Sequence, residues 1–137
     1  MSSSANDPLT VLIDTNVFLW CITGQQSKLS ENAYRVVEDT RVKLWLSTVS
    51  LWEIAIKIGN GKLDLPRSAD FFRTQITRFD IEKVLPIEEA HVLADFGLPR
   101  YHRDPFDRIL IAQAQVEGIP FVTCDKQIQK YPIQILW

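Results

Sequence analysis

Short apolar runs rich in β-branched residues alternate with longer segments of helical periodicity, and this alternation constrains the fold more than any other feature. The runs predicted to be strands are 10–14, 42–47, 82–87, 119–124 and 131–137. The segments predicted to be helices are 15–21, 31–40, 48–59, 67–79, 88–97 and 103–118. Such an alternation favours a parallel sheet with helices on both of its faces. We therefore expect one doubly wound α/β domain.

The length of 137 residues is that of one domain, large enough to fold without disulfide or metal support. Residues 1–9 are expected to form a flexible N-terminal tail, and residues 10–137 the domain itself. No apolar run approaches the length of a membrane span. Cys21 and Cys124 both lie in apolar runs and are expected to be buried free thiols, which is compatible with a cytoplasmic location.

Four acidic residues stand where an α/β protein places the groups of an active site. Asp14 and Asp125 directly follow predicted strands, whereas Glu53 and Asp107 lie in the first two turns of predicted helices. Such positions converge at the carboxyl ends of parallel strands, where open α/β sheets bind ligands. Carboxylates brought together repel one another and are costly to desolvate, so a hard cation such as Mg²⁺ or Mn²⁺ is their natural occupant. We expect a metal-dependent enzyme that acts on phosphodiesters.

Each of these acids taken alone also has a structural explanation. Asp14 and Asp125 could each cap a following helix. Glu53 could complete a capping box with Ser50 and pair with Lys57 one turn later. The helix around Glu53 is otherwise almost wholly apolar, so its narrow polar stripe would face either a polar cavity or a compensating charge.

Two acids stand at the start of the last long predicted helix. Asp104 precedes Pro105, a pairing typical of a helix N-terminus, so capping is its leading explanation. Asp107 shares a helical face with Leu110 and Ile111, which should pack on the sheet. A carboxylate at the head of a buried apolar face is costly without a partner. We therefore assign Asp107 a functional role. One shared site also explains the positions of the four acids better than four separate helix caps would.

The two histidines add little to this site at the level of sequence. His91 is expected at the surface or edge of its helix, and His102 in a loop from which it could touch a substrate. No cluster of His and Cys has zinc-site spacing, and no phosphate-binding glycine loop or G-x-S-x-G motif occurs. The net charge of −2 does not exclude a nucleic-acid partner, because two bound divalent cations would reverse its sign.

Four stretches of the chain resemble the PIN-domain nucleases, and among them the VapC-type toxins of bacterial toxin–antitoxin pairs. They are VLIDTNVFLW, SLWEIAIKIGNGKLDLP, HRDPFDRILIAQAQ and GIPFVTCDKQIQKYPIQILW. With the regions between them, these stretches cover nearly all of residues 10–137. The chain departs from an idealised pattern mainly in its short polar N-terminal extension, which does not touch the chemistry.

The resemblance implies a three-layer α/β/α domain with a central, mostly parallel sheet of about five strands. It also implies a Mg²⁺- or Mn²⁺-dependent endoribonuclease whose acidic quartet is Asp14, Glu53, Asp107 and Asp125, with Asp104 as a neighbouring acid. One or two ions would activate water, and cleavage would leave 5′-phosphate and 3′-hydroxyl ends. The implied partners are a structured RNA substrate, a second copy of the chain in a homodimer, and a cognate antitoxin whose tail enters the acidic groove.

The residues that contact the substrate stay open from sequence alone. Asn16, Lys57 and Arg108 are candidates for contacts with a phosphate. For Lys57 and Arg108, pairing with Glu53 and Asp104 is an equally good explanation. Products with a 2′,3′-cyclic phosphate would instead implicate a histidine that acts without metal.

Other functions also stay open at this level. A haloacid-dehalogenase-like phosphatase would use Asp14 as its nucleophile, but such enzymes generally have a second aspartate where this chain has Asn16. A receiver domain would need an adjacent acidic pair after the first strand, where this chain offers only Asp14. A catalytically idle partner-binding α/β module would be favoured if the protein bound no divalent metal.

Overall fold

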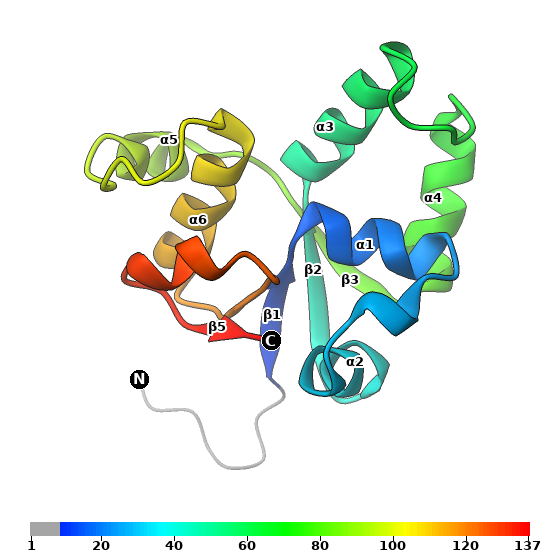
Figure 1. Ribbon diagram of the computed structural model, residues 1–137, viewed down its shortest axis with the longest axis horizontal. Helices are drawn as coiled ribbons and strands as arrows, with labels where there is room; N and C mark the ends of the chain where they lie inside the picture. The colour runs from blue at the N-terminus through cyan, green and yellow to red at the C-terminus, as the bar shows by residue number, and fades with distance from the viewer. Residues whose placement is uncertain (1–8) are drawn as a thin grey trace.

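The computed structural model describes residues 9–137, and a parallel five-stranded sheet forms its centre (Figure 1). The strands are β1 (Thr10–Ile13), β2 (Lys43–Ser47), β3 (Ile81–Leu85), β4 (Phe121–Val122) and β5 (Ile135–Leu136). Their order is β3-β2-β1-β4-β5, and every neighbouring pair is parallel. The chain thus winds outward from β1 in both directions, with the topological switch point between β1 and β4. Residues 1–8 of the predicted tail lie outside the described residues.

Six α-helices connect or flank these strands in the described part of the chain. They are α1 (Thr15–Ile22), α2 (Glu31–Glu38), α3 (Thr48–Gly59), α4 (Ala69–Arg78), α5 (Glu89–Asp95) and α6 (Pro105–Glu117). Two short 3₁₀ helices span Gln26–Lys28 and Lys126–Lys130. All the predicted helices are present, and their ends differ from the predictions by no more than two residues. Within residues 9–137, no helix has the length and apolar character needed to cross a bilayer.

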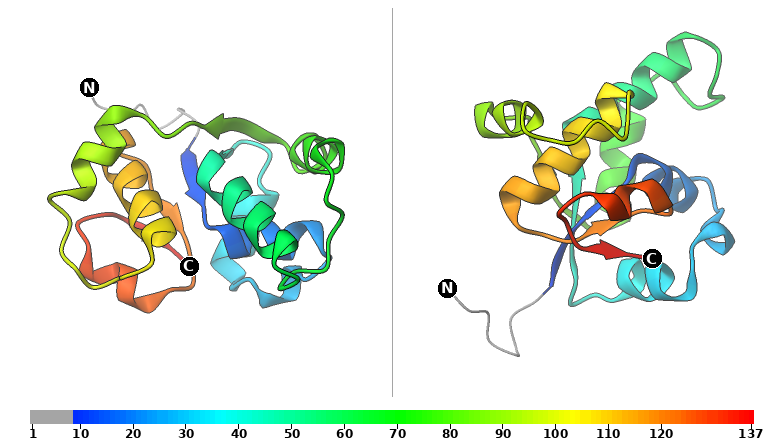
Figure 2. Two further views of the ribbon diagram at one scale, coloured as in Figure 1. Left: turned by 90° about the horizontal axis from the view of Figure 1, so that it is seen from above. Right: turned by 60° about the vertical axis from the view of Figure 1, so that its left-hand side comes forward.

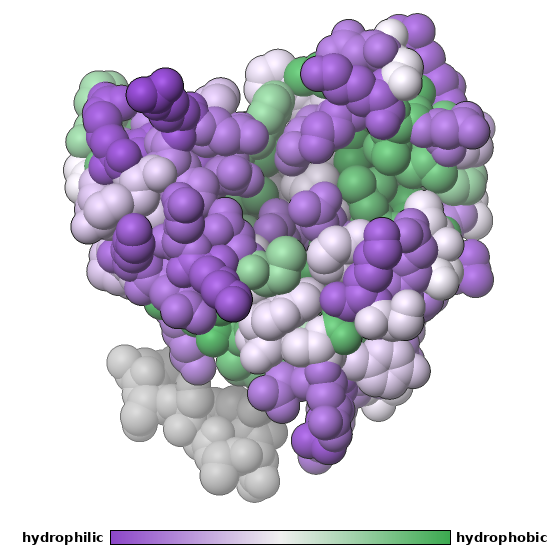
Figure 3. All heavy atoms as spheres, in the orientation of Figure 1, coloured by the Kyte–Doolittle hydropathy of each residue, from purple (hydrophilic) through white to green (hydrophobic). Residues whose placement is uncertain are grey.

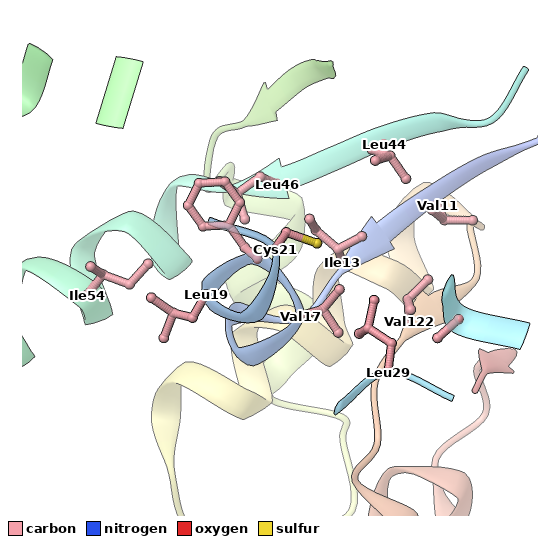
Figure 4. Close-up of a cluster of buried hydrophobic side chains, with 12 residues drawn as sticks. Val11, Ile13, Val17, Leu19, Cys21, Leu29, Leu44, Leu46, Ile54 and Val122 are labelled. Carbon is pink, nitrogen blue, oxygen red and sulfur yellow. The ribbon is translucent and has the colours of Figure 1, made fainter. Parts of the chain in front are cut away.

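Side-chain alternation along β1 divides the core into two layers. Val11 and Ile13 belong to one buried cluster, which also contains Phe18 of α1, whereas Leu12 belongs to the other with Leu110 of α6. Successive residues of a strand point to opposite faces of the sheet. Helices α1, α2 and α4 therefore cover one face, and α5 and α6 cover the other (Figure 2). Figure 4 shows the first cluster around Ile13 and Leu46, and the predicted three-layer α/β/α architecture is confirmed.

His91 is fully buried between α5 and α6, so the expected position at the surface was wrong. Its Nδ1 accepts a hydrogen bond from the amide of Glu88 at 3.0 Å, and its Nε2 lies 2.9 Å from the carboxylate of Glu117. Buried polar groups are tolerated when they are hydrogen-bonded, and here the ring joins two helices. The sequence did not reveal this role because Glu117 lies 26 residues further along the chain.

Candidate metal centre

An acidic pocket of about 210 Å³ lies at the carboxyl ends of β1 and β4 and is also lined by residues of α1, α3 and α6. It is lined by Asp14, Thr15, Asn16, Glu53, Lys57, Asp104, Asp107, Cys124 and Asp125. All four acids of the predicted quartet and the neighbouring Asp104 are in this set. The topology explains the convergence, because β1 and β4 are hydrogen-bonded neighbours and each strand ends within three residues of its aspartate.

Asp14 caps a helix and also brings a poorly solvated charge into the pocket. One carboxylate oxygen accepts a hydrogen bond from the Thr15 amide at 2.7 Å, and the other accepts one from the Thr123 hydroxyl at 2.7 Å. Burial raises the pKa of Asp14, and the charges of Glu53 and Asp125 add to the rise, while the two hydrogen bonds oppose it. No ion pair within residues 9–137 includes Asp14. The capping explanation is therefore correct, and it leaves the buried charge unneutralised.

Asp107 combines burial with the proximity of other carboxylates. Burial raises the pKa of Asp107 to about 7, and the carboxylates of Asp104, Asp14 and Glu53 add to the rise, while His102 opposes it. As predicted, the same helix buries Leu110 against the sheet. A carboxyl group that is half protonated near neutral pH marks a place where a positive charge is needed.

Glu53 faces the pocket from α3 and pairs with Lys57, as one of the two structural explanations predicted, with 2.9 Å between the carboxylate and the ammonium. The predicted capping box between Ser50 and Glu53 was wrong. The N-cap is Ser47, whose hydroxyl accepts from the amide of Val49, so Ser50 lies inside the helix. The buried Ser50 hydroxyl instead accepts a hydrogen bond from the hydroxyl of Thr15 at 2.8 Å and ties α3 to α1.

Asp104 and Asp125 both cap helices while lining the pocket. Asp104 accepts a hydrogen bond from the Phe106 amide at 2.8 Å at the start of α6, as its place before a proline predicted. Asp125 accepts one from the Gln127 amide at 2.9 Å at the start of the short helix Lys126–Lys130. The second oxygen of Asp125 lies 2.9 Å from Nε2 of His102. Possible ligand atoms of His102, Asp107 and Asp125 all lie within 4.8 Å of one another.

Arg108 does not line the pocket, although the sequence made it a candidate for a phosphate contact. Its side chain is buried, and its guanidinium donates to the carboxylate of Asp95 at 2.9 Å and to the carbonyl of Pro99 at 2.8 Å. Two further bonds reach the carbonyls of Asp95 and Leu98. The side chain is thus occupied in holding the segment that joins α5 to α6, and the ion pair of Arg108 is with Asp95 and not with Asp104.

Several residues around the pocket were not anticipated from sequence. They are the hydroxyls of Thr15, Ser50 and Thr123 and the pair formed by His102 and Tyr131. Their partners lie between 29 and 109 residues away in the chain, so no local pattern marks them. The one usable signal is the place of Thr123 at the end of a strand that leads to Asp125.

The two cysteines differ from each other in exposure. Cys21 is buried as predicted, but Cys124 is exposed, because β4 ends at Val122 and leaves Cys124 in the loop beside the pocket. Burial raises the pKa of the Cys21 thiol to about 11, and the charge of Glu38 adds to the rise. Partial burial and the nearby Asp14 also raise the pKa of the Cys124 thiol.

The native protein is expected to react with a disulfide reagent such as DTNB at one of its two thiols, and the denatured protein at both. Only thiolates react, and Cys21 is both shielded and protonated at neutral pH. A Cys124→Ser variant serves as the control, because it should leave no fast-reacting thiol in the native state. Two fast thiols in the native protein would contradict the burial of Cys21.

The donor set fits a hard divalent cation. Asp14, Glu53, Asp107 and Asp125 offer only carboxylate oxygens, which are the preferred ligands of Mg²⁺ and Mn²⁺. Lys57 is the one lysine or arginine among the residues that line the pocket, and it is already paired with Glu53. Burial is the main cause of the raised pKa values of Asp14 and Asp107, and the neighbouring carboxylates add to it, so a cation would stabilise the ionised form of both groups.

Comparison with known proteins supports the fold described above. The chain resembles a chain in the crystal structure of VapBC2 from Rickettsia felis bound to a DNA fragment from the VapBC2 promoter. The TM-score is 0.66 at 11% identity, and the match covers 93% of this chain and 97% of the other. It resembles FitAcB from Neisseria gonorrhoeae with a TM-score of 0.58, 15% identity, and coverage of 91% and 95%. A structure of FitAB bound to an IR36 DNA fragment gives a TM-score of 0.54 at 14% identity, with coverage of 91% and 92%. At these identities, the likeness shows a shared fold.

Among curated proteins, no sequence matches the chain significantly. The family model of the PIN domain, by contrast, matches residues 11–134, which include most of β1, all of β2, β3 and β4, and every acid of the pocket, and which end just before β5. The chain therefore belongs to the PIN domain family.

Proposed function

We propose that this chain is a divalent-metal-dependent endoribonuclease and the toxin of a type II toxin–antitoxin pair. The observation that carries the proposal is the convergence of Asp14, Glu53, Asp107 and Asp125 in one pocket with too little positive charge. Membership of the PIN family supports nuclease chemistry, and it weighs against the phosphatase and receiver alternatives. The toxin role is supported by the sequence resemblance to VapC-type toxins and by the fold shared with VapBC2.

The acids of the pocket are assigned different roles in hydrolysis. Asp14, Asp107 and Asp125 would hold Mg²⁺ or Mn²⁺ directly or through water, and Glu53 would ligate it or orient the attacking water. When bound there, the ion would supply a water of lowered pKa and would stabilise charge on the attacked phosphate. Thr123 and the Thr15 amide keep the Asp14 carboxylate in a fixed orientation.

Contacts with the substrate fall to the polar residues at the open side of the pocket. Lys57 is partly exposed, so its ammonium can reach a phosphate oxygen while it stays paired with Glu53. Asn16 is exposed in the first turn of α1 and offers an amide to the same region. The buried Arg108 has no place in this set.

Both ring nitrogens of His102 are engaged, which argues against a metal-free mechanism with this histidine as the base. Nε2 contacts Asp125, and Nδ1 contacts the hydroxyl of Tyr131. Hydrolysis by activated water is therefore proposed to leave 5′-phosphate and 3′-hydroxyl ends.

An apolar groove of about 390 Å³ between α3 and α4 supports a protein partner. It is lined by Leu51, Ala55, Ile58, Arg67, Ser68, Ala69, Phe72, Arg73 and Ile76, and Figure 3 shows hydrophobic residues gathered on this side of the molecule. An apolar hollow on a protein surface is typical of an interaction site. We propose that an antitoxin binds the chain and sends its tail into the acidic pocket, and that the toxin forms a homodimer, as the sequence resemblance to VapC-type toxins implies.

The test is cleavage of a pool of total small RNA by the purified, antitoxin-free protein with Mg²⁺ or Mn²⁺. Discrete fragments are expected, because the ion and the carboxylates act together, and they should vanish with EDTA and in an Asp14→Asn variant. An Asp64→Asn variant is the matched control, because Asp64 is an exposed acid that does not line the pocket. End-mapping of the fragments would identify the target RNA.

Two outcomes would contradict the proposal. Fragments that form equally in EDTA, or that carry a 2′,3′-cyclic phosphate, would exclude metal-activated water as the nucleophile. No cleavage by folded protein that nevertheless binds Mn²⁺ would keep the metal site and point to a different phosphoryl substrate.

A further inference from the structure

We propose that His102 is a positioning residue of the acidic pocket, which fixes the carboxylate of Asp125 through a hydrogen-bond relay that begins at Tyr131. The inference rests on the metal site of the proposed function. It assigns to His102 neither contact with the substrate nor ligation of the ion.

The imidazole of His102 is held at both of its nitrogens. Nε2 lies 2.9 Å from Oδ2 of Asp125, and Nδ1 lies 3.0 Å from the hydroxyl oxygen of Tyr131. The backbone amide of His102 donates to the same hydroxyl oxygen at 3.0 Å. The His102 side chain is only 8% exposed and Tyr131 only 3%, so water does not compete for these contacts.

This pattern assigns the protons of the relay. The Tyr131 oxygen accepts the amide hydrogen of His102, so the single hydroxyl hydrogen is free to point at Nδ1. When Nδ1 accepts, the proton of a neutral imidazole sits on Nε2, and that N–H donates to Asp125. In the other tautomer, the lone pair of Nε2 would face a carboxylate oxygen, which is repulsive.

Asp125 needs such a partner because its carboxylate would otherwise be free to rotate. The terminal torsion of an aspartate is soft, and the Asp125 side chain is 36% exposed to water. The Gln127 amide binds Oδ1, and Nε2 of His102 binds Oδ2, so both oxygens are held at the same time. This arrangement keeps an oxygen of Asp125 within 4.8 Å of an oxygen of Asp107, a spacing at which one cation can contact both.

Direct ligation of a metal by His102 does not fit the same hydrogen bonds. A ligating Nε2 must be unprotonated, and the proton of a neutral ring would then sit on Nδ1. Nε2 would then give up its hydrogen bond to Asp125, and the Tyr131 hydroxyl would have to accept from Nδ1 instead of donating to it. Groups that hydrogen-bond to metal ligands typically change metal affinity by about 10- to 100-fold when they are removed.

His91 provides a matched control within the same chain. Its Nε2 lies 2.9 Å from the carboxylate of Glu117, the same distance and the same pair of groups as in His102 and Asp125. His91 is fully buried between α5 and α6, and neither it nor Glu117 lines the pocket. A loss that stems from damaged packing should therefore appear in both histidine variants.

The experiment is calorimetric titration of the purified protein with Mn²⁺, without RNA, for the wild type and four variants. His102→Ala is expected to weaken Mn²⁺ binding by about tenfold or more, and His102→Gln to recover most of the loss, because its amide can donate from nearly the position of Nε2. Tyr131→Phe should also weaken binding, since the ring is then free to turn. His91→Gln should lower the thermal midpoint and leave Mn²⁺ affinity unchanged.

Three results would overturn the inference, and they are distinguishable. Equal Mn²⁺ affinity in the wild type and His102→Ala, or in Tyr131→Phe if the alanine variant does not fold, would remove the positioning role and leave the metal site intact. A directly coordinated imidazole nitrogen in pulsed EPR spectra of the Mn²⁺ complex would make His102 a ligand. Absence of Mn²⁺ binding by the folded wild type would overturn the proposed metal site itself, and the positioning role with it.

Discussion

An Asp107→Asn substitution is expected to lower RNA cleavage by at least about 10²-fold, the usual loss when an electrostatic contact to a transition state is removed. The same substitution is expected to stabilise the metal-free protein above neutral pH. Asparagine keeps the volume of the side chain and removes a charge that burial, Asp104 and Asp14 all disfavour. Opposite effects on activity and stability are typical of residues that a protein holds in an unfavourable environment for function.

The raised pKa of Asp107 determines in which direction the stability of the protein changes with pH. The pKa of Asp107 is about 7 in the folded protein and has an ordinary value of 3.8. Between these values the folded state keeps a proton that the unfolded chain has released, so the free energy of unfolding falls as the pH rises. The stabilisation that the protonated Asp107 contributes to the free energy of unfolding is fully present below the ordinary pKa and is lost as the pH rises through about 7.

Urea unfolding in EDTA from about pH 5 to about pH 8 measures this contribution. The wild type should lose stability across this range, and Asp107→Asn should lose less, although Asp14 keeps part of the dependence because its pKa is also raised. Asp64→Asn is the control and should follow the wild type. Added Mn²⁺ should stabilise the wild type more than Asp107→Asn, because a ligand that binds only the folded state favours it. Identical pH profiles for the wild type and Asp107→Asn would contradict the assignment.

Arg108→Ala is expected to lower the free energy of unfolding by about 3 kcal/mol, because it removes a buried cation and its hydrogen bonds. The Arg108 side chain is only 6% exposed, and it donates to the Asp95 carboxylate and to the carbonyls of Asp95, Leu98 and Pro99. These acceptors belong to the segment that carries His102 and Asp104 to the pocket. Loss of the Arg108 hydrogen bonds should therefore let residues 96–104 open at a lower free energy than the rest of the fold.

Chemical denaturation measures the total cost, and amide hydrogen exchange of residues 96–104 measures the local part. Arg108→Lys should recover little of the stability, since an ammonium cannot reproduce the planar set of donors. Arg73→Ala is the matched control, because Arg73 forms an exposed pair with Asp70 and should cost less than about 1 kcal/mol. A cost for Arg108→Ala as small as that of the control would show that the buried bonds contribute little.

The sheet and the acidic quartet could be predicted because their signals are local. Each strand is a short apolar run, and Asp14 and Asp125 follow their strands within a few residues. The order of the strands then brings these acids together without any information about individual contacts. The same locality explains the correct cap at Asp104, where one residue type at one position determines the structure.

The polar pairs that complete the site could not be predicted, because each joins distant parts of the chain. Ser50 and Glu53 have the spacing of a capping box, yet the helix begins earlier and the Ser50 hydroxyl bonds Thr15. Arg108 follows an acid and resembled a phosphate contact, yet its partners are the carbonyls of a loop whose path the sequence does not reveal. Hydrophobic periodicity determines which face of a helix is buried, and it leaves the pairing of buried polar groups undetermined.

The hydrogen bond between Thr123 and Asp14 joins residues that are 109 positions apart. This separation determines the order in which the parts of the pocket emerge during synthesis of the chain. β1 can pair with β2 as soon as residue 47 has left the ribosome, whereas its other neighbour, β4, emerges well after β2. Asp125 is the final acid of the quartet to be translated, so an emerging polypeptide lacks a complete pocket until residue 125 has left the ribosome. For the proposed ribonuclease, this order would keep each new molecule inactive beside the ribosome that makes it until that point.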